Sequence, residues 1–472
     1  MSGFEEYDRH DALGLAERVE RGDVRPSELL ELAIRRAEER DPAIGAVVIP
    51  MFDEARAAIE AGLPAGPFRG VPFLLKDLHA CYAGVRTTNG CALFEDFVPD
   101  HDSEIVRRYR RAGLVIFGKS ASPELGLSTS TESRLFGPTR NPWNRDTTAG
   151  GSSGGAAAAV AAGILPAAHA SDGGGSIRIP ASCCGLFGLK PTRARNPSGP
   201  DVGEGWSGMS TAHAVTRSVR DSAALLDATR GPDVGDPYWA PPPERSYLEE
   251  LRRSPGALRI AFTTRAWNGV PTHSDCAAAV TDAAELCARL GHRLEEDAPV
   301  IDPQMLAEVA RIIISASVRA ALEDRAAALG RELKADDVEP ATWGLLAMVP
   351  STGADYARAL RNMHALGREV GRFFERYDVL LSPTMATPPL PLGALNASSG
   401  DLQQYVGNLL LTVGFTQLFN ITGQPAMSVP LFWNGAGIPI GTQFAGRFGD
   451  EATLFRLAAQ LEAERPWFDR RP

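Results

Sequence analysis

Residues 150–176 are nearly all small and almost uncharged, and this segment restricts how the chain can fold more than any other. It begins with Gly-Gly-Ser-Ser-Gly-Gly at 150–155 and continues as a run of alanines, broken only by Val160, up to Gly163. A helix that is apolar on every side must be buried, with neighbouring backbone packed closely against it. We therefore predict a helix over 155–163 in the interior of the fold.

The predicted helix joins two loops that both contain serine. A strand is predicted at 164–170, and the segment Ser-Asp-Gly-Gly-Gly-Ser follows it at 171–176. The helix would run about 14 Å in one direction, and roughly four or five strand residues would return the chain by a similar distance. This geometry can bring Ser152 and Ser176 to the same end of a sheet.

Apolar runs and amphipathic helices alternate along the chain, which predicts an α/β fold. The runs 70–78 and 113–119 have the length of buried strands, and a helix is predicted between them at 102–111. Strand, helix and strand at this spacing indicate a sheet that is buried on both faces. Further strands are predicted at 258–263, 379–382, 426–431 and 438–444, and further helices at 218–230, 275–290, 303–329, 353–377 and 451–464. One large domain with a mostly helical insertion at about 232–375 fits this order better than two independent domains.

Composition excludes several classes of protein. The chain has 472 residues and a formal net charge of −10, whereas nonspecific binding to nucleic acid or to an anionic membrane needs a basic patch. It contains no run of about 18 uncharged apolar residues of the kind that spans a membrane. The six cysteines form no C-x-x-C motif and no finger-like pairing with histidine, so a reducing cytoplasm is the simplest compartment. We expect no metal, no cofactor, no nucleic acid and no membrane partner.

The glycines before Ser176 suit a loop whose N–H groups point into one concavity. Beside a serine hydroxyl, such a nest has the parts of an oxyanion hole next to a nucleophile. A tight turn between strand and helix is the alternative for a single Gly-Gly-Gly-Ser. Because two Gly/Ser loops are joined by a buried helix here, a catalytic role is favoured over a simple turn.

The first loop has two further interpretations. Gly150–Gly154 matches G-x-S-x-G, the nucleophile elbow of α/β-hydrolases, which requires Asp and then His downstream. Four histidines lie downstream in segments without special backbone chemistry, namely His213, His273, His292 and His364. A phosphate-binding loop would need a lysine directly after the glycines, and the sequence has none there. His169, on the predicted apolar strand, is expected to be a core histidine.

Without a histidine, the base must come from another residue type, and lysine is scarce. The chain has 44 arginines and only four lysines, at positions 76, 119, 190 and 334. A lysine is a base only when neutral, and lowering its pKa from about 10.4 to near 7 costs on the order of 4 kcal/mol. The apolar neighbours of Lys76 could impose that desolvation, whereas Lys334 lies in a charged, solvated segment. The residue pattern does not rank Lys76 above Lys119.

A specific combination of motifs is spread along the chain: Leu75–Asp77, Thr139–Trp143, Gly150–Gly155, Asp172–Ala181, Gly185–Thr192 and Pro439–Gln443. Together these motifs resemble the amidase signature family, and the resemblance extends over nearly the whole chain. It implies a single large α/β domain over 1–472, with a catalytic core at about 65–200. The central sheet would be mixed and twisted, with helices covering both faces.

The resemblance also implies a Ser–Ser–Lys triad. Lys76 would be the base, Ser152 the bridging serine, held by a cis peptide bond after Gly151, and Ser176 the nucleophile. The oxyanion hole would consist of four N–H groups, those of Gly173, Gly174, Gly175 and Ser176. Gly173 stands where the family usually has Thr or another β-branched residue.

Three further residues have supporting roles by the same resemblance. Ser153 would support Lys76 by hydrogen bonding. Asp172 and Arg178 would brace the loop that carries the nucleophile.

The activity implied is that of an amide-cleaving hydrolase that forms an acyl-enzyme on serine. Within the family, the motifs are most similar to members that open cyclic 6-aminohexanoate dimers. This favours a small neutral substrate, either a 6-aminohexanoate-type, aliphatic or aryl amide or a carbamate or ester. The pocket would be framed by residues 125–131, 312–317 and 343–348. Its expected lining residues are Leu127, Ser128, Thr129, Ile314 and Ser315.

Two other functions stay open at this point. One of the chains of a glutamyl-tRNA(Gln) amidotransferase would work only inside a complex that binds tRNA, and the acidic charge argues against it. An α/β-hydrolase-type esterase would need one of the downstream histidines as its base. The expected partners are a small-molecule amide and water, and a homodimer is one open alternative for the assembly.

Overall fold

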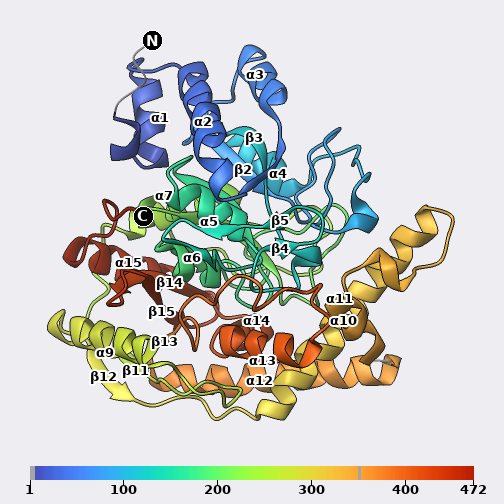
Figure 1. The fold of residues 1–472 in the computed structure, drawn as a ribbon. Helices are drawn as coiled ribbons and strands as arrows, with labels where there is room; N and C mark the ends of the chain where they lie inside the picture. Colours follow the sequence, from blue (N-terminus) through green and yellow to red (C-terminus); the bar gives the residue numbers. More distant parts are fainter. Residues whose placement is uncertain (1–5, 349–351) are drawn as a thin grey trace.

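An eight-stranded mixed sheet runs through the molecule (Figure 1). The computed structural model describes residues 6–348 and 352–472. In spatial order the strands are β12 (Arg293–Glu296), β11 (Arg259–Phe262), β13 (Val379–Pro383), β15 (Pro439–Gly446), β14 (Ala426–Trp433), β9 (Phe187–Lys190), β10 (Thr211–Thr216) and β8 (Ala167–Asp172). In this sheet β11 is parallel to β12 and β13, and the other neighbouring strands are antiparallel. The mixed α/β architecture that the sequence predicts is confirmed.

Helices surround the sheet and occupy most of the periphery of the molecule (Figure 1). In chain order they are α1 (Ala12–Glu20), α2 (Pro26–Arg40), α3 (Phe52–Glu60), α4 (Glu104–Arg111), α5 (Gly154–Ala161), α6 (Arg178–Cys184), α7 (Val219–Thr229), α8 (Tyr247–Glu250), α9 (Ser274–Arg289), α10 (Pro303–Ala328), α11 (Pro340–Met348), α12 (Gly353–Arg376), α13 (Leu402–Val413), α14 (Gln417–Thr422) and α15 (Glu451–Glu464). The range 232–375 carries α8 to α12 and also the edge strand β12 and its neighbour β11, so it contributes to the main sheet. The domain boundaries stay a prediction.

Both faces of the sheet are covered, as expected. Successive side chains of a strand point to opposite faces, and here neighbours on one strand belong to different apolar clusters. Leu381 and Met427 pack in a cluster with α7, α9 and α15. Leu380 and Ala426 pack in another with α10, α12 and α14. This alternation holds the sheet between two helical layers.

A smaller sheet places the end of one of its strands beside the main sheet. It has the order β1 (Val47–Pro50), β3 (Val115–Ser120), β2 (Pro72–Lys76), with β2 and β3 parallel and α4 between them in the chain. Strand β2 packs beside β8 of the main sheet. The backbone N–H of Lys76 donates to Nδ1 of His169 at 3.1 Å. The last residue of β2 therefore lies next to the strand that leads into the second Gly/Ser loop.

Helix α5 is the buried small-residue helix that the sequence predicts. All its residues from Gly154 to Ala161 are buried. A Cβ atom placed on Gly155 would collide with the backbone nitrogen of Ala121. Alanine and glycine are needed here because the neighbouring backbone leaves no room for larger side chains.

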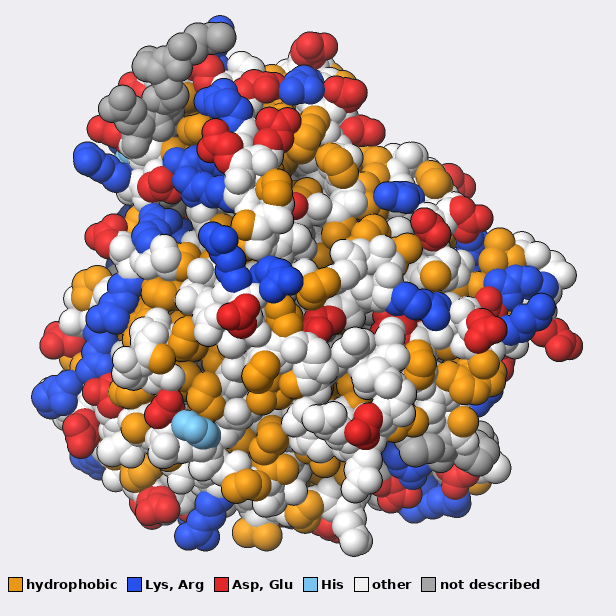
Figure 2. Space-filling view, viewed as in Figure 1, with side chains coloured by type: hydrophobic (Ala, Val, Ile, Leu, Met, Phe, Trp, Pro, Cys, Tyr) orange, Lys and Arg blue, Asp and Glu red, His pale blue; other side chains and the backbone are white. Residues whose placement is uncertain are grey.

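The surface carries charges of both signs, in line with the charged residues of the sequence. Arginine side chains are interspersed with acidic ones on the face shown in Figure 2, and some form ion pairs, such as Arg56 with Glu31 at 2.8 Å. Within residues 6–348 and 352–472, no helix has the length and apolar character needed to cross a membrane.

Candidate active site

The first Gly/Ser loop turns sharply just before α5. The peptide bond between Gly151 and Ser152 is cis, as the family resemblance implies. A Cβ on Gly151 would lie 2.6 Å from the carbonyl carbon of Thr129, so only glycine allows the segment 125–131 to pack this closely. Ser152 is 2% exposed. The loop thus holds this hydroxyl inside the protein, beside the end of β2.

The side chain of Lys76 is hydrogen-bonded to this hydroxyl group. Its Nζ donates to Oγ of Ser152 at 2.7 Å and to Oγ of Ser171 at 3.1 Å. The side chain is completely buried, and burial lowers its pKa to about 7, although the negative charge of Asp172 opposes the shift. A lysine with this pKa is about half neutral at neutral pH and can accept a proton there.

The other two buried lysines make structural contacts instead. Lys119 Nζ donates to the carbonyl of Arg86 at 2.8 Å and to Oγ1 of Thr87 at 2.5 Å. Lys190 Nζ donates to the carbonyl of Pro191 at 2.8 Å. Burial lowers the pKa of Lys119 to about 8 and that of Lys190 to about 7. The pKa therefore does not single out one lysine, whereas contact with the serine loops does.

The second Gly/Ser loop presents Ser176 two residues before α6, with 8% of its surface exposed. The N–H of Gly175 donates to Oδ1 of Asp172 at 2.7 Å. Within the described residues, the N–H groups of Gly173, Gly174 and Ser176 have no acceptor. The expectation that Gly175 also serves the oxyanion hole is corrected, because the carboxylate already takes that N–H group.

Ser176 and Ser152 lie on neighbouring segments but are not directly bonded. Among the described residues, no hydrogen bond joins their hydroxyl groups. A Cβ on Gly126 would lie 3.2 Å from Oγ of Ser152, and Gly126 lines the same cavity as Ser176. Catalytic hydrogen bonds often close only when substrate is bound.

A buried ion pair braces the second loop. Arg178 donates from Nη2 to Oδ1 of Asp172 at 2.9 Å and from Nε to Oδ2 at 2.9 Å, and both side chains are fully buried. Burial alone would raise the pKa of the carboxyl group, but the Arg178 guanidinium holds the pKa of Asp172 well below its usual range. Arg178 also donates to the side chains of Gln443 at 2.7 Å and Asn420 at 2.5 Å. The bracing contact expected for Asp172 and Arg178 is present, and Asn420 and Gln443 extend it to α14 and β15.

The expected hydrogen bond between Ser153 and Lys76 is wrong. The Ser153 hydroxyl donates to the carbonyl of Ser171 at 3.2 Å and accepts from its N–H at 3.3 Å. Ser171 instead contacts Nζ of Lys76. The helix α5 begins at the next residue, so the Ser153 side chain points at the backbone of β8 and not at β2. Ser171 is a polar residue at the end of an apolar strand, and this position is the sequence signal that indicates its contact with Lys76.

A cavity of about 330 Å³ opens beside Ser176 and Gly174. Of the expected lining residues, Leu127, Ser128, Thr129 and Ile314 line it. Ser315 does not, since it is 2% exposed and its hydroxyl donates to the carbonyl of Ile312 at 3.2 Å. Neighbouring helix residues point about 100° apart, so α10 can turn only one of the pair toward the cavity. Leu345 also lines it and lies in the expected segment 343–348, whereas sequence reasoning missed several other lining residues, namely Trp206, Tyr405, Leu409, Val413 and Gln417.

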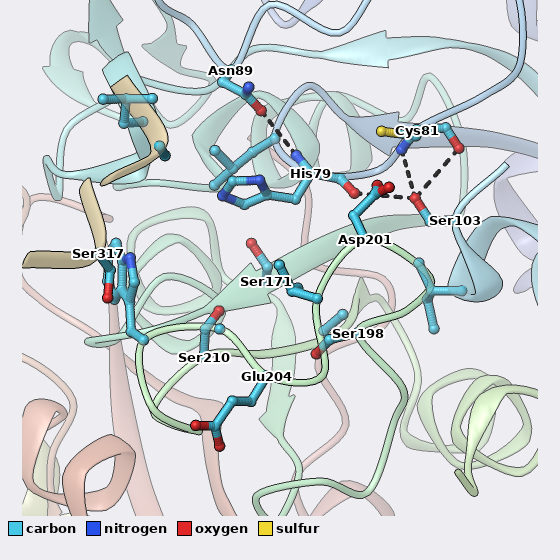
Figure 3. Close-up of a pocket in the computed structure, with 18 of the residues that line it drawn as sticks. His79, Cys81, Asn89, Ser103, Ser171, Ser198, Asp201, Glu204, Ser210 and Ser317 are labelled. Atoms are coloured by element: carbon cyan, nitrogen blue, oxygen red, sulfur yellow. Dashed lines mark hydrogen bonds between the residues drawn. The ribbon is translucent and has the colours of Figure 1, made fainter. Parts of the chain in front are cut away.

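A second, larger cavity of about 580 Å³ lies beside Ser171, the second serine that Lys76 contacts. Ser171 is part of its wall, and so is Trp206, which lines both cavities. Figure 3 shows His79, Ser171 and Asp201 around this space. The backbone N–H of His79 donates to Oδ1 of Asn89 at 3.0 Å, which joins two residues of the cavity wall.

The histidines occupy structural positions. His169 accepts the N–H of Lys76, His213 pairs with Ser222 at 2.8 Å, and His292 pairs with Gln460 at 2.9 Å. In the described part of the chain, no histidine is hydrogen-bonded to the hydroxyl of Ser152, Ser153 or Ser176. The α/β-hydrolase interpretation therefore lacks its base.

Comparisons with known proteins agree over the length of the chain. The Amidase family model matches residues 28–455. The 6-aminohexanoate-cyclic-dimer hydrolase of Paenarthrobacter ureafaciens is 38% identical over 476 residues, which cover 98% of this chain and 96% of that protein. A solved structure of 6-aminohexanoate cyclic dimer hydrolase superposes with a TM-score of 0.94 at 38% identity, covering 98% of this chain and 99% of that one. A bacterial aryl acylamidase of the amidase signature family superposes with a TM-score of 0.88 at 28% identity, covering 98% and 99%. The chain therefore belongs to the amidase signature family and is an amide-cleaving hydrolase.

Proposed function

We propose that the chain hydrolyses small neutral amides through an acyl-enzyme on Ser176, with Lys76 and Ser152 moving the proton. The observation that carries this proposal is the 2.7 Å hydrogen bond between Nζ of Lys76 and Oγ of Ser152. It joins a buried lysine with a pKa of about 7 to the loop that faces the nucleophile. A base with a pKa near the working pH transfers protons efficiently in both directions.

The first half of the reaction forms the acyl-enzyme. Neutral Lys76 takes the proton of Ser152 as Ser152 takes the proton of Ser176, and the Ser176 oxygen bonds to the amide carbon. The resulting oxyanion accepts hydrogen bonds from the free N–H groups of the second loop. The carbon–nitrogen bond then breaks, and the leaving nitrogen takes a proton from Ser152, which Lys76 replaces.

The second half restores the enzyme. Water attacks the ester carbon and gives its proton through Ser152 to Lys76. The ester bond breaks, Ser176 regains its proton, and the carboxylic acid leaves. Each proton taken by Lys76 is returned within the cycle, so the net reaction is amide plus water giving acid plus amine.

The substrate class follows from the wall of the cavity beside Ser176. Most of its lining side chains are aliphatic or aromatic, and the acidic and basic ones among the described residues are Glu124 and Arg311. Burial raises the pKa of Glu124, so its charge is disfavoured. A neutral aliphatic or aryl acyl group therefore fits best. The relatives named for 6-aminohexanoate cyclic dimer hydrolysis support a 6-aminohexanoate-type amide, and a carbamate or an ester would use the same steps.

A reducing cytoplasm is the compartment we propose. All six cysteines are buried and unpaired, including the adjacent Cys183 and Cys184. Burial raises the pKa of the Cys183 and Cys184 thiols well above the ordinary value, which makes them unreactive.

Labelling with a fluorophosphonate tests the nucleophile. We expect one covalent adduct, found on Ser176 by peptide mass spectrometry, and none in the Ser176→Ala variant. An adduct on Ser152 or Ser153 would reject the assignment. The purified chain should also hydrolyse simple amides without a partner, whereas activity only in a complex with other proteins would favour the amidotransferase alternative.

A further inference from the structure

The indole ring of Trp206 rests on the backbone of the oxyanion loop. A Cβ atom placed on Gly173 would lie 2.6 Å from Cζ3 and 2.8 Å from Cε3 of this ring. Real Cβ atoms do not approach other carbons this closely, so a side chain at position 173 would displace the ring. The absence of a side chain at Gly173 is what makes room for the tryptophan.

Trp206 lies between the two cavities. It lines the cavity of about 330 Å³ that contains Ser176. It also lines the cavity of about 580 Å³ that contains Ser171. On one side the ring packs against the cluster of α10, α12 and α14, and on the other against a cluster that includes Leu125 and Val318. The ring is thus a wall with a different space on each side.

The backbone fixes this wall in place. Trp206 has φ +51 and Ser207 has φ +53, the left-handed region that residues other than glycine rarely adopt. Gly208 and Ser210 both donate their N–H groups to the carbonyl of Gly205 at 3.1 Å, which closes the turn. The Ser207 hydroxyl is 2.5 Å from the hydroxyl of Tyr356 on α12. Such a conformation persists only where the surroundings determine it.

The proton relay connects the two cavities. Lys76 contacts Ser152, which lies against Gly126 in the wall of the smaller cavity, and Ser171, which is in the wall of the larger cavity. In the proposed reaction the leaving nitrogen must take its proton from Ser152. The amine half of the substrate therefore points toward the relay and the larger cavity, while the acyl half stays beside Ser176.

The lining of the larger cavity suits an amine. Its walls include the apolar side chains of Phe94, Phe97 and Ile105. Its carboxyl groups are Asp201 and Glu204, and no Lys or Arg is among its described lining residues. An amine product carries a positive charge at neutral pH, and carboxylates attract it.

We infer that Trp206, seated on Gly173, is a specificity-determining wall that separates an acyl pocket from an amine pocket, and that the larger cavity takes an apolar primary amine. This inference rests on the proposed function. It assigns the second cavity a ligand class, and it explains why glycine replaces the β-branched residue of the family at position 173.

The first test couples the two residues of the wall. Gly173→Ala should lower kcat/KM for N-benzylhexanamide by about tenfold when Trp206 is present, and by much less in the Trp206→Ala background. Equal losses in both backgrounds would overturn the pairing. Trp206→Ala should also raise the kcat/KM of N-benzyldiphenylacetamide relative to N-benzylhexanamide by about tenfold, because the acyl pocket gains space. Trp239→Ala, at an exposed tryptophan, should leave this ratio unchanged.

The second test asks which half occupies the larger cavity. Ala321 lines it, so Ala321→Phe should lower the kcat/KM ratio of N-benzylhexanamide to N-methylhexanamide by about tenfold. An unchanged ratio, or one that instead follows the length of the acyl chain, would overturn the assignment. Calorimetry with benzylamine on Ser176→Ala needs no turnover, and Ala321→Phe should weaken this binding. If the wild type hydrolyses no amide, the proposed function fails, while the benzylamine measurement still decides about the cavity.

Discussion

Nζ of Lys76 lies 2.7 Å from Oγ of Ser152, although 76 positions separate the two residues in the chain. The contact exists because β2 packs beside β8 and because the loop before α5 places Ser152 at the end of β2. It connects a buried amine, which can be neutral near pH 7, to a serine of the first Gly/Ser loop, and the same amine reaches Ser171 at the start of the second. The proton transfer that we propose depends on this contact.

Removing the amine should abolish proton transfer while the fold is kept. Lys76→Met keeps most of the side-chain volume, and we expect kcat to fall by about 10³-fold or more, in the range that general-base catalysis supplies. Circular dichroism should remain native. Lys119→Met is the control, because Lys119 contacts Arg86 and Thr87 and neither serine loop, and it should lower thermal stability more than kcat. Comparable losses of kcat in the two variants would contradict the role of Lys76.

The pH dependence should follow the neutral form of Lys76. Because its pKa is about 7 and only the neutral amine accepts a proton, kcat/KM should rise with pH, with a midpoint near 7, and then level off. Below that midpoint the rate should fall about tenfold per pH unit. A midpoint of about 10, the value for an exposed lysine, would argue against a buried base.

The same pKa predicts that stability also depends on pH. In the folded chain the pKa of Lys76 is about 7, below the ordinary value of 10.5, so the unfolded chain binds more protons between these values. The free energy of unfolding should therefore rise with pH across this window, and the penalty should be complete below pH 7. Lys76→Met should be more stable than the wild type at pH 6, measured by urea unfolding. A smaller difference at pH 6 than at pH 10 would contradict this sign.

Ser171→Ala should shift the pH profile. The Ser171 hydroxyl oxygen accepts a hydrogen bond from Lys76, which favours the charged amine. Without it the pKa of Lys76 should fall, moving the midpoint of kcat/KM to lower pH. Ser153→Ala is the matched control, because the Ser153 hydroxyl contacts the backbone of Ser171 and should leave the midpoint in place when removed. Equal shifts in both variants would mean that the loop, and not the hydroxyl contact, sets the profile.

Breaking the buried ion pair should unfold the second loop or the protein. Asp172→Asn leaves the guanidinium of Arg178 buried without its countercharge, and removing one partner of such a pair costs about 3–5 kcal/mol. Urea unfolding should show a loss of this size. A loss below about 1 kcal/mol, the value for a surface pair, would show that the pair is not buried in solution.

Local patterns predicted much of the fold. Helix α15 occupies Glu451–Glu464, the range predicted from its apolar spacing, and Asp450 caps it by accepting the N–H of Thr453. The long helices and the strands that follow them lie within a few residues of their predicted ranges. These elements depend on periodicity and capping, which neighbouring residues determine.

The site was predicted less completely, for geometric reasons. The sequence predicted that Ser153 contacts Lys76, whereas in the structure Ser171 makes this contact. The start of α5 decides which way Ser153 points, and its hydroxyl contacts the backbone of Ser171. Ile314 faces the cavity and Ser315 does not, because the rotation of α10 depends on its packing. The resemblance to the family implied the cis peptide bond and the brace of the second loop, which composition alone would not have indicated.

By itself the sequence determined that a helix of small residues is buried, that it joins two serine loops, and that few lysines are available as a base. The residue pattern left three lysines open and the family resemblance implied Lys76, and the tertiary structure shows that Lys76 is hydrogen-bonded to a serine. Only the tertiary structure decided which N–H groups of the second loop remain free. It also decided that the ring of Trp206 fills the space above Gly173. The physical reason is that secondary structure depends on nearby residues. The site, in contrast, depends on distances between residues far apart in the chain, which are set by how strands and helices pack.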